Sequence, residues 1–106
     1  VAPAGIGINF DAGNAATFAD DAVALLDRVI DRVVSLHASD SATRGRLQHV
    51  QVGAGITPYP AIFRRLVRAG WDGWICIEEA SNQGEAGVAA AVRYVREAWQ
   101  AAQVQA

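Results

Sequence analysis

The sequence contains no lysine and no methionine, and it has a single cysteine, Cys76. All nine of its basic side chains are therefore arginines, so neither a lysine Schiff base nor the lysine of a phosphate-binding P-loop can occur in this segment. One cysteine cannot form an internal disulfide bond, which favours a reducing compartment such as the cytoplasm. Because the chain begins at Val1 without methionine, we expect a fragment of a longer polypeptide.

The chain also lacks a long apolar run and a surplus of positive charge. No apolar stretch reaches the roughly 18 residues that a membrane helix needs, and no signal peptide opens the chain. The formal net charge of −2 provides no attraction for nucleic acid or acidic lipid, so we expect neither as a partner. With 52% hydrophobic and 19% charged residues, the composition is that of a globular domain.

Apolar runs bounded by turn signals predict three strands, at residues 5–10, 33–36 and 74–77. Each run is followed by residues with helical spacing, and strands that alternate with helices indicate a parallel sheet with right-handed crossovers. The strands read as continuous apolar segments, which is typical of a sheet covered on both faces. A sheet of three such strands would have two unpaired edges, so we expect further strands to complete it.

The ends of the helices are predicted from capping signals. Thr17 is expected to cap the first helix, and Pro58 or Pro60 to start the second. The segment His49–Val52 is interpreted as a short extra strand between the second strand and its helix. Residues 101–106, at the end of the last helix, are expected to fray.

Each predicted strand ends in a residue that can bind a metal ion: Asp11, His37 or Glu78. Because the carboxyl ends of parallel strands meet at one edge, we expect these groups to lie within about 5 Å of a common point. Oxygen and nitrogen ligands of this kind suit Mn²⁺, Co²⁺, Mg²⁺ or Zn²⁺. Glu79 follows directly, and strand alternation lets only one of the two glutamates face that point; the pattern favours Glu78.

The segments around these residues resemble one family. The runs 7–14, 34–40, 52–55 and 69–78, in this order, are similar to the last three βα units of the sugar phosphate isomerases and epimerases, the xylose isomerase-like TIM barrels. The resemblance implies that residues 1–106 form the C-terminal portion of an α/β, (β/α)₈ barrel. Since a complete barrel needs roughly 250 residues, the implied partners are the missing N-terminal barrel strands or a second copy of the chain.

The resemblance also implies a metal site and a reaction. Asp11, His37 and Glu78 match three of the four metal ligands in this family, and the fourth, a glutamate, belongs to an earlier strand that this segment does not contain. The implied activity is isomerisation or epimerisation of a sugar or sugar phosphate, in which the ion stabilises an enediolate and Glu78 is one of two glutamates that move the proton. The isolated segment is expected to be inactive.

Three further residues are implied to bind the substrate. Many members carry a substrate-binding histidine at the position of Asn14, whose amide can still form a hydrogen bond with a sugar hydroxyl. Members often place an arginine after the segment that contains the ligand histidine, and Arg44 and then Arg46 are the nearest candidates.

Two other functions remain open. A DNA-repair endonuclease of the endonuclease IV kind resembles the same fold, but it needs more histidine and acidic ligands and a basic surface, whereas this chain has two histidines and a net charge of −2. The segment could also be a partial barrel that acts only as an interaction module, because a fold does not determine a function.

Overall fold

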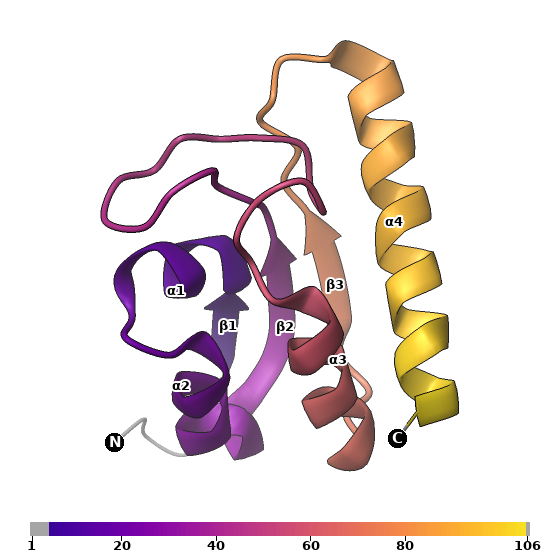
Figure 1. The fold of residues 1–106 in the computed structure, drawn as a ribbon. Coiled ribbons are helices and arrows are strands. Elements are labelled where there is room, and N and C mark those ends of the chain that lie inside the picture. Colours follow the sequence, from indigo (N-terminus) through magenta and orange to yellow (C-terminus); the bar gives the residue numbers. More distant parts are fainter. Residues whose placement is uncertain (1–4, 106) are drawn as a thin grey trace.

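The computed structural model describes residues 5–105, which form a parallel three-stranded sheet with helical connections (Figure 1). The strands β1 (Ile8–Asp11), β2 (Val33–Ala38) and β3 (Trp74–Ile77) lie side by side in sequence order. Both neighbouring pairs are parallel. The α/β fold with three consecutive βα units, expected from the sequence, is confirmed.

Helices connect the strands and follow the last one. The helices α1 (Ala12–Phe18) and α2 (Ala22–Val29), with the short 3₁₀ turn η1 (Ile30–Arg32), join β1 to β2. The helix α3 (Tyr59–Arg68) joins β2 to β3, and α4 (Gly84–Gln105) follows β3. Among the described helices, none combines the length and the apolar character that crossing a membrane requires.

The expected N-cap at Thr17 is wrong, because the segment holds two helices in place of one. Asp11 caps α1 by accepting the backbone N–H of Asn14, so the chain becomes helical directly after the strand. Asp21 caps α2 in the same manner. Thr17 is buried inside α1, where its hydroxyl donates to the Gly13 carbonyl at 2.7 Å. The aspartates prevail because a carboxylate is among the strongest acceptors for the free N–H groups of a first helical turn.

The ends of the later elements also differ in part from expectation. Pro58 is the N-cap of α3 and Pro60 lies in its first turn, as the sequence indicated. The extra strand at His49–Val52 is wrong, since only an isolated bridge joins His49 to Ser41. The expected fraying is wrong for residues 101–105, which are helical, and Ala106 lies outside the described residues.

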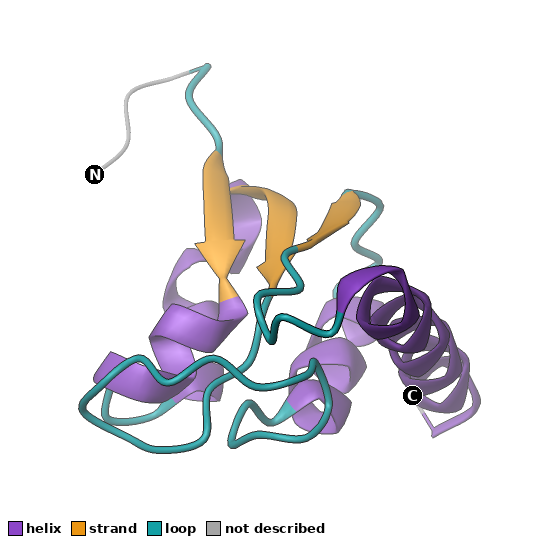
Figure 2. Ribbon diagram, turned by 90° about the horizontal axis from the view of Figure 1, so that it is seen from above, coloured by secondary structure: helices purple, strands orange, loops and turns teal. Residues whose placement is uncertain are grey.

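One face of the sheet forms the core with the helices, which Figure 2 shows gathered mainly on that side of the strands. Leu36 of β2 is fully buried there. An aromatic cluster joins α3 to α4, in which the Trp99 ring meets Phe63 and Trp71 at centroid distances of 5.4 and 6.3 Å. The largest fully buried hydrophobic side chains are Tyr59, Phe63, Leu26, Leu36, Ile62 and Leu66.

The other face of the sheet carries no helix in the described part of the chain, so the expected cover on both faces is not found there. Asn9 and Cys76 are exposed on it, and Trp74 is 78% exposed. Phe10 and Leu36, which the apolar runs alone would allow to point into the interior of a barrel, instead pack in the core with the helices and are 4% and 0% exposed.

The 106-residue chain alone is expected to self-associate. In the described structure β1 and β3 each have one edge without a partner strand, and unpaired edges recruit other strands. The Trp74 and Val34 side chains are exposed to solvent. Burying a large apolar side chain would stabilise the fold by roughly 1.5–3 kcal/mol, and this contribution is missing for each of them. Sedimentation of the purified chain should therefore show oligomers. A clean monomer with a sharp cooperative melt would contradict this expectation.

Candidate metal centre

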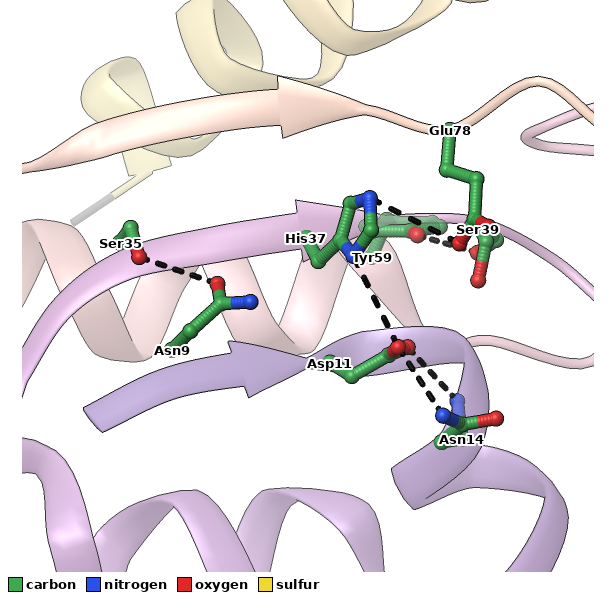
Figure 3. Close-up of polar contacts among 8 residues, drawn as sticks. All are labelled: Asn9, Asp11, Asn14, Ser35, His37, Ser39, Tyr59 and Glu78. Carbon is green, nitrogen blue, oxygen red and sulfur yellow. Dashed lines mark hydrogen bonds and ion pairs between the residues drawn. The ribbon is translucent and has the colours of Figure 1, made fainter.

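Asp11, His37 and Glu78 meet at the carboxyl end of the sheet. Asp11 is paired with His37 in the strand register, and the backbone N–H of Glu78 donates to the Ala38 carbonyl at 2.8 Å, so the three strands end at one level. One possible ligand atom from each of the three side chains lies within 4.8 Å of the other two. The expected convergence of these groups is therefore present in the structure (Figure 3).

The His37 ring lies between the two carboxylates. Its Nδ1 is 3.8 Å from Oδ2 of Asp11, and its Nε2 is 3.6 Å from Oε1 of Glu78. All three side chains keep contact with solvent, with exposed fractions of 27% for Asp11, 32% for His37 and 45% for Glu78. The group is thus accessible to a ligand from the solvent.

The donor set fits a divalent cation. Two atoms bound at roughly 2.0–2.6 Å to one ion lie at most about 5 Å apart, which agrees with the 4.8 Å spread of the three ligand atoms. Two carboxylates and one imidazole suit Mn²⁺, Co²⁺, Mg²⁺ or Zn²⁺. Three ligands also leave coordination positions for a further protein group and for substrate oxygens.

Asn14 lies beside the centre and contacts Asp11 through two hydrogen bonds. Its backbone N–H donates to Oδ1 of Asp11 and its side-chain Nδ2 donates to Oδ2, both at 3.0 Å. Both oxygens of the Asp11 carboxylate are therefore oriented by one residue, as Figure 3 shows. The Asn14 side chain can still offer its amide oxygen to a substrate hydroxyl.

Within the described residues, neither Arg44 nor Arg46 forms a hydrogen bond or an ion pair with Asp11, His37 or Glu78. The Arg44 guanidinium donates to the Ala19 carbonyl at 2.8 Å and to the Asp20 carbonyl at 3.1 Å, which fastens the loop after β2 to the end of α1. Arg46 is exposed, and its carbonyl accepts a long, 3.4 Å hydrogen bond from the Ser41 hydroxyl. Their role in substrate binding stays a prediction.

Two carboxylates near the centre turn away from it. Glu79 accepts the backbone N–H of Val52, so Glu78 alone of the two adjacent glutamates joins the three-ligand group. Asp40 is 1% exposed and accepts backbone N–H groups of the loop that follows β2. In the sequence, Asp40 could equally be a loop cap or a residue that supports the metal ligands. The glycine pair at 53 and 55 was the available signal for its contacts with the loop.

Tyr59 links α3 to the end of β2. Its buried hydroxyl donates to the Ser39 carbonyl. Burial raises the pKa of Tyr59 well above its usual value, and the nearby charges of Asp40 and Asp11 raise the pKa further. Tyr59 therefore stays protonated throughout the neutral range and acts as a hydrogen-bond donor.

The chain is similar to proteins of one family. Residues 1–98 match the family described as xylose isomerase-like TIM barrel. The rhizopine catabolism protein MocC of Rhizobium meliloti is 28% identical, in an alignment that covers 76% of this chain and 30% of that protein.

Two solved structures have the same fold. The xylose isomerase domain protein from Planctomyces limnophilus superposes with a TM-score of 0.78 at 24% identity, over 92% of this chain and 39% of that one. A D-tagatose 3-epimerase-like protein superposes with a TM-score of 0.79 at 22% identity, over 93% and 36%. The chain therefore spans less than two fifths of the length of each of these relatives. With nearly all of its residues matched by the family and its three βα units in the family's fold, this chain belongs to the xylose isomerase-like TIM barrel family.

Proposed function

We propose that this chain contributes three of four protein ligands to the divalent metal centre of a sugar isomerase or epimerase. The observation that carries the proposal is the convergence of Asp11, His37 and Glu78, from three neighbouring strands, within 4.8 Å. The family match and the fold shared with an epimerase-like protein support a sugar isomerase or epimerase type of function. The substrate would be a sugar or a sugar phosphate.

Within this proposal, Asp11 and His37 hold the ion, and Glu78 both binds it and moves a proton. A bound Mn²⁺, Co²⁺, Mg²⁺ or Zn²⁺ would polarise the sugar carbonyl and its neighbouring hydroxyl, and would stabilise the enediolate that forms when a proton leaves. Glu78 is suited to the proton transfer because its carboxylate is the most exposed of the three ligands, at 45%. Glu78 shares this transfer with the second glutamate of the missing strands: one carboxylate accepts the proton from the carbon next to the carbonyl, and the other returns a proton at another position or face.

Asn14 and one arginine bind the sugar in the proposed site, and strands outside this segment complete the barrel. The Asn14 amide oxygen accepts a hydrogen bond from a sugar hydroxyl, while its amide nitrogen stays on Asp11. Arg44, or Arg46 in its place, binds the substrate. A fourth ligand, a second glutamate, comes from strands that pair with the open edges of the sheet. Those strands belong to an N-terminal barrel segment or to a second copy. We place this activity in cytoplasmic carbohydrate metabolism.

Replacing Glu78 with glutamine in the whole protein is expected to abolish nearly all turnover. The substitution removes a ligand charge and the proton acceptor, and loss of general acid–base catalysis alone lowers rates by about 10²–10⁴-fold. Steady-state kinetics with aldose and ketose substrates would measure it. Glu97→Gln, an exposed carboxylate of α4, is the matched control and should retain full activity.

If Glu78→Gln kept most of the activity while Glu79→Gln lost it, the assignment of the catalytic glutamate would be wrong by one residue.

Replacing Asn14 with alanine is expected to act mainly on substrate affinity. Loss of one neutral hydrogen bond, worth about 0.5–1.5 kcal/mol, corresponds to a rise in KM of roughly 2- to 10-fold. The comparison of KM with kcat in the purified variant would measure it. An unchanged KM together with weaker metal binding would instead assign Asn14 solely to the orientation of Asp11.

A further inference from the structure

The strands β2 and β3 each lead to one of the proposed metal ligands. Each of them is also followed by a carboxylate that points away from the metal centre. Asp40 comes three residues after His37, and Glu79 comes directly after Glu78. Both carboxylates bind backbone N–H groups of one short segment, residues 52–57, in the loop between β2 and α3. Two ligand-bearing strands are thus tied to the same piece of backbone.

Asp40 makes the more extensive set of contacts. Its carboxylate is 1% exposed and accepts four backbone N–H groups at 2.9–3.0 Å. A buried carboxylate is tolerated where such donors replace its water. The donors are the N–H groups of Ser41, Gly53, Gly55 and Thr57. The loop therefore folds around this carboxylate.

Glu79 holds the same segment from the end of β3. Its Oε1 accepts the backbone N–H of Val52 at 3.0 Å, and its other oxygen accepts the hydroxyl of Ser81. Val52 is 3% exposed, so the donor side of this hydrogen bond is buried. The N–H of Val52 goes to the end of β3 and the N–H of Gly53 goes to the end of β2.

The two glycines of this segment permit the close approach. A Cβ atom at Gly55 would lie 2.2 Å from the Ser41 carbonyl oxygen and 2.4 Å from Oδ1 of Asp40. Gly53 has a φ of +99°, and a Cβ atom there would lie 2.6 Å from the Tyr94 ring. A side chain at Gly55 would push the backbone away from the Asp40 carboxylate, and one at Gly53 would collide with the Tyr94 ring in a backbone conformation that favours glycine.

We infer that Asp40, Glu79 and residues 52–57 form a carboxylate clamp that sets the separation of His37 and Glu78. The inference rests on the proposed metal centre. The register of β2 and β3 ends at Ala38 and Ile77, so Glu78 lies beyond the last strand pair. The clamp supplies a further connection there. Since adjacent side chains of an extended chain point to opposite sides, anchoring Glu79 in the loop directs Glu78 toward the centre.

Asp40 and Glu79 are thus positioning residues. Replacing either one should weaken metal binding by more than the accompanying loss of folding stability accounts for. In the whole protein, titration with Mn²⁺ should show binding about 10- to 100-fold weaker for Glu79→Ala, as for other groups that orient metal ligands. Glu79→Gln should retain affinity within about 3-fold, because its amide oxygen still accepts the Val52 N–H. The exposed Glu97→Ala is the control and should bind Mn²⁺ normally.

Thermal melting of the same variants separates positioning from folding. If Glu79→Ala proves too unstable to purify, Ser81→Ala, which removes only the hydroxyl on Glu79, should still lower Mn²⁺ affinity by roughly 3-fold. Unaltered Mn²⁺ affinity in a Glu79→Ala or Ser81→Ala protein with a lowered melting temperature would overturn the clamp and leave the metal centre intact. Failure of the unsubstituted protein to bind Mn²⁺ would overturn the proposed function and the clamp with it.

Discussion

Parallel pairing of β1, β2 and β3 is the constraint on which the candidate site depends. Parallel strands with helical crossovers return to the same edge of the sheet, so residues that follow different strands become neighbours. Asp11, His37 and Glu78 are far apart in the sequence, and the pairing brings together the strand ends that carry them, where their side chains lie within 4.8 Å of one another. The charges of Asp11 and Glu78 on either side of one imidazole make this edge a place for a cation.

The two faces of the sheet have different roles: one packs in the core, and the other lies beside the metal centre. On one face, Leu36 and its neighbours pack against the helices and form the core. On the other face, β3 carries Trp74 and Cys76, whereas β1 and β2 carry Asn9 and Ser35 next to the metal centre, and the Ser35 hydroxyl donates to the Asn9 amide oxygen at 3.0 Å (Figure 3). In a closed barrel the second face points inward, so Asn9 and Ser35 would line the interior beside the metal centre.

Strand positions and ligand identities could be predicted from the sequence because they depend on local patterns. The apolar run at 74–77 predicted the exact bounds of β3, and each predicted strand was followed by a side chain that can bind a metal ion. The sheet face without helices could not be predicted from the sequence. The strands are short, and the polar residues Asn9 and Ser35 alternate with apolar neighbours over too few positions to stand out. The contacts of Asp40 could not be predicted for another reason. Three of its four partners are backbone N–H groups more than ten residues away, and a sequence pattern does not reveal such contacts.

We propose that this chain and the rest of a barrel share one metal centre. The most direct test is the anomalous diffraction of crystals of the whole protein grown with Mn²⁺. We predict one strong peak at the carboxyl end of the sheet, within about 2.0–2.6 Å of ligand atoms of Asp11, His37 and Glu78, with a fourth protein ligand from another strand. A fully occupied Mn²⁺ site elsewhere, with none at these three side chains, would contradict it.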